Sequence, residues 1–190
     1  MQILRKPPWL KKRMLSNSTT SAVNQTLSGK NLHTVCESAK CPNKHECFGS
    51  GTATFMILGE ICTRNCGFCG VRKGTPGSAE PLEPVRVAEA VYEMHLKHVV
   101  ITSVTRDDLP DGGLNHFKET VEAVRKLNPN AVVEILTPDF SGVRNAAESI
   151  AEIKPDVFNH NMEMVPRLYP IIRPKALWER SLNLLKNVAK

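Results

Sequence analysis

Residues 52–69 read TATFMILGEICTRNCGFC, an apolar run that leads directly into three closely spaced cysteines. The largely apolar and β-branched residues 52–61 are typical of a strand buried on both faces of a parallel sheet. Cys62, Cys66 and Cys69 follow with a C-x3-C-x2-C spacing. Parallel α/β folds place their active groups at the carboxyl ends of such strands. The stretch therefore predicts both a parallel sheet and the place of its site.

The rest of the chain alternates between strand and helix patterns. Short apolar runs bounded by turn residues predict strands, and apolar residues spaced three and four apart predict helices. Apolar strands joined by right-handed helical crossovers curve into part of a barrel. We therefore expect an α/β fold, a partial parallel (βα) barrel of about four βα units. The expected strands are 52–61, 98–104, 131–136 and 156–159, and the expected helices are 84–96, 115–127, 140–153 and 175–190.

The chain before the barrel divides into two further segments. Residues 1–30 hold a Pro-Pro-Trp sequence, a basic run and a serine- and threonine-rich stretch without apolar periodicity, so we expect an extended basic arm there. Residues 31–52 hold three cysteines among few regular patterns, and we expect a loop organised by metal. Residues 53–190 are expected to form the barrel.

The net charge of +6 is concentrated in the arm, because six of the 25 Lys and Arg residues precede Glu37, the first acidic residue. No aromatic-rich strand motif or recognition helix accompanies these charges, so no nucleic-acid partner is predicted. No run approaches the roughly 18 to 20 apolar residues of a membrane-spanning helix, and the start lacks a secretory signal. These patterns predict a cytoplasmic protein without a membrane partner.

All six cysteines fall between positions 36 and 69, which favours metal ligation over disulfide bonds in a reducing compartment. The group Cys62, Cys66 and Cys69 can hold three irons of a cubane cluster and leave the fourth iron open to a substrate. The alternative is structural zinc, which normally takes four ligands, often in two C-x2-C pairs. Only one such pair is present, so the spacing favours the cluster.

The first cysteine group, Cys36, Cys41 and Cys47, has a C-x4-C-x5-C spacing that is less specific. His33 and His45 lie near enough in the sequence to complete a zinc site. The spacing alone therefore leaves both zinc and an iron-sulfur cluster open.

The C-x3-C-x2-C group after the first strand of an α/β barrel resembles the radical S-adenosylmethionine (radical SAM) superfamily. Residues 32–76, which contain both cysteine groups, closely resemble the lipoyl synthase family. The resemblance continues along the chain, over residues 5–11, 104–113, 134–140, 155–161 and 165–169.

This resemblance implies two 4Fe-4S clusters and S-adenosylmethionine as cofactors. The second cysteine group would hold the catalytic cluster, and the first would hold an auxiliary cluster that donates sulfur. The implied reaction inserts two sulfur atoms at C6 and C8 of an octanoyl chain on a lysine. That lysine belongs to a carrier, either a dehydrogenase E2 domain or the glycine-cleavage carrier protein. A radical from cleaved S-adenosylmethionine would attack the C–H bonds, with an electron from a donor such as flavodoxin or ferredoxin.

The resemblance also implies roles for five residues outside the cysteines. Phe68 matches an aromatic position near the adenine of S-adenosylmethionine. Ser103 and Thr105 end a predicted strand where the superfamily contacts the methionine moiety. Asn159 and Asn161 end the fourth strand, where they would hydrogen-bond the ribose or, alternatively, satisfy loop backbone.

Two features depart from the family pattern. The family barrel has six strand–helix units, and its auxiliary cluster takes a serine from an Arg-Ser-Ser motif near the carboxyl terminus. This chain has about four units, each of about 30 residues, and no such motif. We expect a lipoyl synthase that lacks its carboxyl-terminal third, and the alternative is a non-catalytic iron-sulfur or zinc-binding module.

Overall fold

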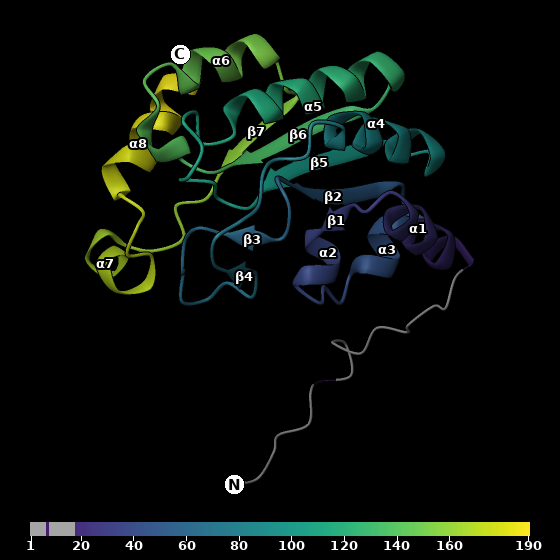
Figure 1. Ribbon diagram of the computed structural model, residues 1–190, viewed down its shortest axis with the longest axis horizontal. Coiled ribbons are helices and arrows are strands. Elements are labelled where there is room, and N and C mark those ends of the chain that lie inside the picture. The colour runs from purple at the N-terminus through teal and green to yellow at the C-terminus, as the bar shows by residue number, and fades with distance from the viewer. Residues whose placement is uncertain (1–6, 8–17) are drawn as a thin grey trace, which may run out of the picture.

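The computed structural model describes Pro7 and residues 18–190 (Figure 1). Everything predicted for residues 1–6 and 8–17, including most of the basic arm, lies outside the described residues. Within the described part of the chain, no helix is long and apolar enough to cross a membrane.

The prediction of an extended arm is wrong for Ser18–Gly29, which forms helix α1. Val23 and Leu27, one helical turn apart, are buried in the core, because α1 packs against α3 (Lys44–Gly49) and α4 (Glu83–Glu93). Burial of this apolar pair outweighs the weak helix preference of the serines and threonines around it.

Five strands form the central sheet: β1 (His33–Thr34), β2 (Thr52–Ile57), β5 (His98–Ser103), β6 (Val132–Thr137) and β7 (Val157–His160). Their spatial order is β1-β2-β5-β6-β7, with β1 antiparallel to β2 and every other pair parallel. The parallel strands are neighbours in chain order, which is the winding of a (βα) barrel. Within residues 18–190 the sheet ends at β1 and β7 without closing, so the predicted partial parallel barrel is confirmed.

The centre of the sheet is a layer of large apolar side chains. Phe55, Ile101 and Ile135 are aligned across β2, β5 and β6 and are at most 1% exposed. Each fully buried side chain of this kind stabilises the fold by roughly 1.5 to 3 kcal/mol.

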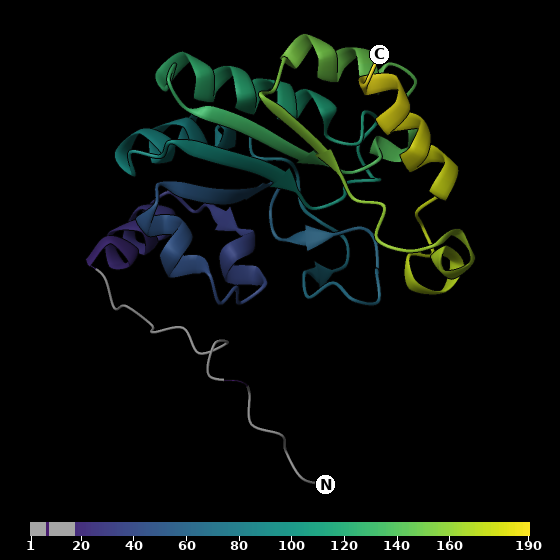
Figure 2. The ribbon, with the colours of Figure 1, turned by 180° about the vertical axis from the view of Figure 1, so that it is seen from behind.

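Helices α4, α5 (Leu114–Leu127) and α6 (Ala146–Ile153) cover one side of the parallel strands. In Figures 1 and 2 they lie above the strands, and the amino-terminal helices lie below them. Phe117 and Val121 of α5 are fully buried. The alternation of strands with covering helices follows the predicted order.

The predicted helix over residues 140–153 is interrupted near its start. A 3-10 turn occupies Phe140–Gly142, and α6 begins only at Ala146. Phe140 and Ser141 have φ values of 45° and 54°. Because these values leave the right-handed helical region, a continuous helix cannot pass through them.

The carboxyl-terminal part departs slightly from the prediction. Helix α8 (Trp178–Val188) matches most of the helix expected over 175–190. A short helix, α7 (Tyr169–Ile172), precedes it and was not predicted.

The two cysteine groups lie on small elements. The segment expected as a metal-organised loop contains the short helices α2 (Val35–Ser38) and α3. The second group starts in a two-stranded parallel sheet, β3 (Ile61–Cys62) and β4 (Arg72–Lys73). Figures 1 and 2 show β3 and β4 beside α2, below the main sheet.

A buried carboxylate fixes the turn that leads from β2 toward β3. Glu83 is 4% exposed and accepts a hydrogen bond of 2.7 Å from the backbone N–H of Leu58. His116 of α5 is 2.7 Å from the same carboxylate oxygen. One acidic side chain of α4 therefore joins the end of β2 to α5, and buried polar groups satisfied in this way hold one geometry.

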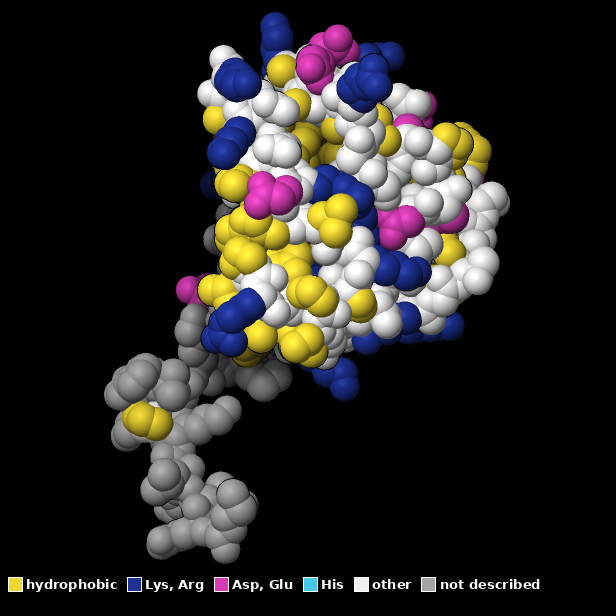
Figure 3. Space-filling model, turned by 90° about the vertical axis from the view of Figure 1, so that its left-hand side faces the viewer, with side chains coloured by type: hydrophobic (Ala, Val, Ile, Leu, Met, Phe, Trp, Pro, Cys, Tyr) yellow, Lys and Arg dark blue, Asp and Glu magenta, His cyan; other side chains and the backbone are white. Residues whose placement is uncertain are grey.

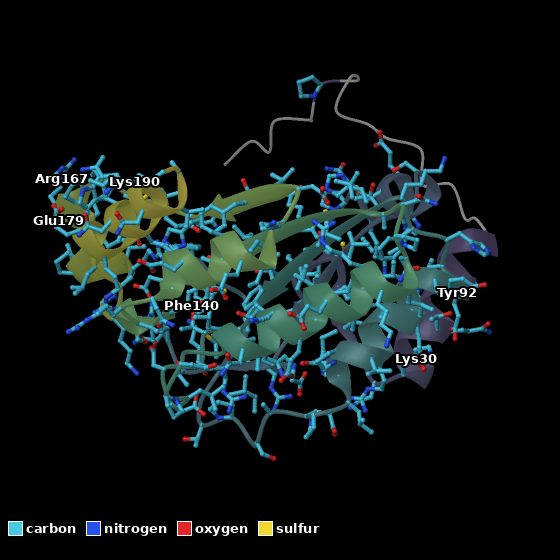
Figure 4. All side chains as sticks on the ribbon, turned by 90° about the horizontal axis from the view of Figure 1, so that it is seen from above. Lys30, Tyr92, Phe140, Arg167, Glu179 and Lys190 are labelled. Atoms are coloured by element: carbon cyan, nitrogen blue, oxygen red, sulfur yellow. The ribbon has the colours of Figure 1, made fainter. Side chains whose placement is uncertain are left out.

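A glycine turn sets the distance between α5 and the loop after β6. Gly112 has a φ of 62°, and a Cβ at this position would lie 2.9 Å from the Cα of Phe140, the residue labelled in Figure 4. Only glycine combines this backbone angle with such a close approach. The loop held in this way carries Asp139, which lies beside the second cysteine group.

We expect the substitution Gly112→Ala to lower the free energy of unfolding by about 2 kcal/mol or more, because it adds left-handed strain and a backbone clash. Urea unfolding followed by circular dichroism measures the change. Gly77→Ala is the matched control, since a Cβ there meets nothing within 4 Å. Equal stability of the Gly112→Ala variant and the original chain would contradict this account of the turn.

Candidate functional site

The carboxyl ends of β5, β6 and β7 surround a cavity of about 120 Å³. This is the edge at which parallel sheets bind their ligands. Arg64, from the loop of the second cysteine group, also lines the cavity, so loop and cavity form one site. The polar lining from the strand ends and the segment after β7 includes Ser103, Thr105, Thr137, His160, Asn161 and Arg173.

Four polar atoms at this cavity are buried without a hydrogen-bond partner among the described residues. They are Ser103 Oγ, Thr137 Oγ1, His160 Nε2 and Arg173 Nε. A buried polar atom left unpaired costs about 1 to 3 kcal/mol. Since native proteins rarely leave such atoms unsatisfied, four at one cavity indicate that it is shaped for a polar ligand.

His160 presents a hydrogen-bond acceptor to the cavity. Its Nδ1 is 2.8 Å from the carbonyl oxygen of Thr137. A carbonyl only accepts, so Nδ1 carries the proton and Nε2 is left with a lone pair. Burial lowers the pKa of His160 below its ordinary value of 6.5, and the hydrogen bond to Thr137 opposes this shift only in part. The neutral imidazole at pH 7 can therefore accept from a ligand hydroxyl or ammonium group.

Arg173 brings a positive charge to the same cavity. Its Nη1 donates to the carbonyl oxygen of Asn161 at 3.0 Å, and its guanidinium lies 5.3 Å from the centre of the Tyr169 ring. These contacts hold the side chain while Nε stays unpaired. A guanidinium held in this way suits a ligand carboxylate.

The loop of the second cysteine group is fastened to the rim of the cavity. Both the backbone N–H and the hydroxyl of Thr63 donate to the carbonyl oxygen of Thr105, at 3.1 and 2.9 Å. The N–H of Gly67 donates to the carbonyl oxygen of Ile172 at 2.8 Å. The ends of β5 and α7 therefore fix the loop on two sides.

The first cysteine group adjoins this loop. Cys36 is buried in α2, and the N–H of Cys41 donates to the carbonyl oxygen of Cys36 at 3.0 Å. A Cβ at Gly70, directly after the second group, would lie 4.0 Å from the carbonyl oxygen of Ser38. The two cysteine-bearing segments are therefore neighbours.

None of the six cysteines forms a disulfide, and among the described residues no three His, Cys, Asp or Glu side chains converge to hold a single metal ion. A cubane cluster needs something different, because each of its thiolates binds a different iron and the sulfurs need not meet at one point. Three free, half-buried thiols in one short loop beside a polar cavity fit such a cluster. A structural zinc site normally takes four ligands, and this loop supplies three thiols, so the loop fits zinc less well than a cluster.

Arg64 lies between Cys62 and Cys66, and its side chain is 4% exposed. Its Nε and Nη2 donate to the two carboxylate oxygens of Asp107 at 2.8 and 2.7 Å. Nη2 also donates to Asp139 at 2.6 Å. Asp107 follows β5 and Asp139 follows β6, so one side chain of the cysteine loop is bound to two strand ends. We call these three residues the Arg64 clamp.

The carboxylates of the clamp are themselves held in place. Asp139 is almost fully buried, accepts from the backbone N–H of Ser141 at 3.2 Å and pairs with Arg180 of α8 at 3.3 Å. Burial alone would raise the pKa of Asp107, but hydrogen bonds from Arg64 and Ser141 outweigh burial and hold that pKa below its ordinary value. The carboxylate of Asp107 is therefore suited to stay charged beside the guanidinium.

The structure brings only some of the predicted contact residues together. Ser103, Thr105 and Asn161 line the cavity. Phe68 is 49% exposed and lies outside the cavity lining. The amide of Asn159 donates to Glu134 at 2.6 Å and does not line the cavity either.

Three residues of the site were not found by sequence reasoning: Arg64, Asp139 and His160. Arg64 lies inside the cysteine spacing, and His160 separates the two predicted asparagines. A basic residue between clustered cysteines and polar residues at strand ends are the signals that could have identified them. The pairing of Arg64 with Asp139 has no signal along the sequence.

The segment between β7 and α8 forms an exposed rim beside the site. Val165, Ile171 and Leu177 of this segment are 50%, 73% and 54% exposed. Figure 3 views the side of the molecule that carries α7 and α8, where hydrophobic side chains lie among Lys and Arg. Lys175 also donates to the carbonyl oxygen of Thr63 at 2.8 Å, so the rim contacts the cysteine loop.

Comparison with known proteins matches residues 56–190 to the radical SAM superfamily. The lipoyl synthase of Caldanaerobacter subterraneus subsp. tengcongensis is 56% identical over 185 residues, which make up 97% of this chain and 64% of that protein. The lipoyl synthase of Caldicellulosiruptor saccharolyticus is 51% identical over 190 residues, 100% of this chain and 66% of that protein.

A third relative, the lipoyl synthase of Haemophilus influenzae, is 54% identical over 187 residues, 97% of this chain and 58% of that protein. The chain thus spans 58–66% of the length of these curated relatives. The similarity includes the region that holds both cysteine groups.

We expect the imidazole of His160 to titrate below its ordinary pKa of 6.5, because its burial disfavours the charged form. The folded protein then binds this proton more weakly than the unfolded chain does. The contribution of His160 to stability is complete above the ordinary pKa and is lost as the pH falls through the lowered pKa. NMR titration of labelled histidines measures the pKa directly.

Urea unfolding at about pH 8 and about pH 5 tests the same linkage. The variant His160→Gln should show a smaller difference in the free energy of unfolding between these two pH values. His95→Gln is the matched control, since His95 is exposed and should leave the difference unchanged. A pKa for His160 at or above its ordinary value would contradict this reading.

Proposed function

This chain belongs to the radical SAM superfamily, and we propose that it carries the catalytic site of a lipoyl synthase. The observation that carries the proposal is a loop of three free thiols fastened beside a cavity with four unpaired buried polar atoms. The high identity to lipoyl synthases over nearly the whole chain supports the choice of reaction.

We propose that Cys62, Cys66 and Cys69 hold a 4Fe-4S cluster, which when bound supplies the electron that cleaves S-adenosylmethionine to methionine and a 5′-deoxyadenosyl radical. The cavity beside the loop would receive the S-adenosylmethionine. Its carboxylate suits the guanidinium of Arg173, and its ribose hydroxyls suit the lone pair on His160 Nε2.

The remaining cavity residues complete the binding proposal. The hydroxyl groups of Ser103 and Thr137 are unpaired and can donate to the ligand or accept from it. Thr105 and Asn161 line the same wall. The half-exposed ring of Phe68 is available to lie near the adenine, and Asn159 remains a predicted ribose contact.

We propose that Cys36, Cys41 and Cys47 hold a second 4Fe-4S cluster, which supplies the sulfur atoms. The close approach of the two cysteine-bearing segments supports this assignment, because sulfur must reach the carbon from which hydrogen has been removed. His33 and His45 are not needed as ligands in this proposal.

The substrate would be an octanoyl chain amide-linked to a lysine of a carrier, and the products would carry sulfur at C6 and C8. The carrier is a dehydrogenase E2 domain or the glycine-cleavage carrier protein, and the electron comes from a donor such as flavodoxin or ferredoxin. The exposed apolar and basic rim is suited to meet such a partner protein. A reducing compartment such as the cytoplasm would keep the six cysteines in the thiol form that binds iron.

A second candidate is a metal-binding module that does not cleave S-adenosylmethionine. The observation that favours it is the open sheet, which ends at β7 with no strand beyond it among the described residues. A barrel that is open at this edge exposes its interior to water, which radical chemistry must exclude.

After anaerobic reconstitution with iron and sulfide we expect about eight irons per chain and cleavage of S-adenosylmethionine to 5′-deoxyadenosine under reducing conditions. Replacing Cys62, Cys66 and Cys69 together by alanine should remove about four irons and abolish cleavage. Iron analysis and chromatography of 5′-deoxyadenosine provide the two measurements.

The matched control replaces Cys36, Cys41 and Cys47 by alanine. This variant should also lose about four irons but keep the cleavage reaction. Stoichiometric zinc in place of iron, or full iron loading without any cleavage, would contradict catalysis by this chain and favour the metal-binding module.

A further inference from the structure

Arg64 is covalently tied to two of the proposed cluster ligands, because it lies two residues after Cys62 and two before Cys66. The position of its guanidinium therefore restricts the position of the backbone between Cys62 and Cys66. The guanidinium is held by two carboxylates from two different strand ends. The position of the cysteine loop relative to the cavity therefore depends on this side chain.

The contacts of the Arg64 clamp are directional. Two parallel hydrogen bonds to Asp107 fix the plane of the guanidinium, and the bond to Asp139 fixes its rotation within that plane. A lysine at this position would keep the charge but lose the planar fork. The pairing is therefore specific for arginine and sets an orientation as well as a distance.

Burial makes the clamp unlike a surface ion pair. The side chains of Arg64 and Asp139 are 4% and 1% exposed. A buried ion pair gains little net stability over apolar packing, because the removal of both charges from water offsets much of their attraction. In some proteins such a pair instead selects a single defined arrangement of the segments that it joins.

We propose that Arg64 is a positioning residue that holds the loop of the second cysteine group in one orientation against the ends of β5 and β6. Only the effect of this orientation on the iron-sulfur cluster rests on the proposed function. The orientation of the loop itself is a property of the metal-free chain. Asp107 and Asp139 act through Arg64 and are positioning residues in the same sense.

The first experiment uses the reduced, metal-free chain and measures how fast iodoacetamide alkylates each cysteine, by mass spectrometry. In Arg64→Gln we expect Cys66 to react about tenfold faster, because losing the charge-assisted hydrogen bonds makes opening of the loop more frequent. Cys36, outside the loop, should keep its rate. Arg64→Lys should fall between the two, since it keeps only the charge.

Arg72→Gln is the matched control. Arg72 lies three residues beyond Cys69 and, like Arg64, pairs with a carboxylate, that of Glu60 at 2.6 Å. Unlike Arg64, its side chain is 68% exposed. Removing this charge should leave the alkylation rate of Cys66 unchanged. An unchanged rate in Arg64→Gln, or an equal rise in Arg72→Gln, would overturn the proposal.

Asp107→Asn keeps the test valid if Arg64→Gln does not fold. Asp107 is 25% exposed, so replacing it leaves a smaller buried defect than replacing Arg64. It should raise the rate at Cys66, and the double variant with Arg64→Lys should add little, because both changes weaken the same contact. Independent, additive effects would overturn the proposal.

The second experiment uses the reconstituted chain and electron paramagnetic resonance of the reduced cluster. In Arg64→Lys we expect the cluster signal to persist, while the change caused by S-adenosylmethionine requires a higher concentration of it. The yield of 5′-deoxyadenosine should fall by up to about 100-fold, as small misplacements of reacting groups do elsewhere. If Arg64→Lys matched the original chain in both the S-adenosylmethionine concentration required and the yield of 5′-deoxyadenosine, the proposed effect of Arg64 on the cluster would be overturned.

The two experiments separate the two hypotheses. If no cluster assembles in any variant, the proposed function fails, while the alkylation rates still decide whether the clamp exists. If clusters assemble and cleavage occurs but the alkylation rates do not respond to Arg64, the function stands and the clamp is wrong.

Discussion

The guanidinium of Arg64 meets carboxylates that follow two different strands, and the geometry of the site depends on this contact. The loop of the second cysteine group has few apolar side chains of its own, so apolar packing alone does not hold it in one place. Here a charged side chain inside the loop is buried against Asp107 and Asp139. Both carboxylates follow strands of the sheet. The sheet therefore determines where the loop and its thiols lie.

Several features of the fold serve the same arrangement. Gly112 lets the start of α5 approach the loop that carries Asp139, and the buried carboxylate of Glu83 holds the turn that leads toward Cys62. The strand ends that supply the clamp also supply two of the four unpaired polar atoms of the cavity, Ser103 Oγ and Thr137 Oγ1. Loop and cavity are therefore placed by a common set of strands, which is why a ligand in the cavity would meet the cysteines.

The two cysteine groups reach this edge by different routes. The second group follows the first parallel strand, while the first group lies on short helices that precede it and pack against β2. Near Gly70 the two segments are neighbours, although the barrel winding alone would not bring them together. A reaction that needs a radical at one centre and sulfur from another requires such a neighbouring placement, and this fits the proposed lipoyl synthase chemistry.

The sequence by itself determined the parallel strands, the order of strands and helices, the two cysteine groups and the edge at which the site lies. Apolar runs and cysteine spacing are local patterns, and Ser103, Thr105 and Asn161 could be placed because they follow predicted strands. Only the tertiary structure decided that 18–29 form a helix and that a helix over 140–153 breaks at Phe140, since burial and positive φ arise from distant contacts. The same holds for Arg64, whose partners lie 43 and 75 residues away. Ion pairs of this kind are made by the fold, because no local pattern brings such residues together.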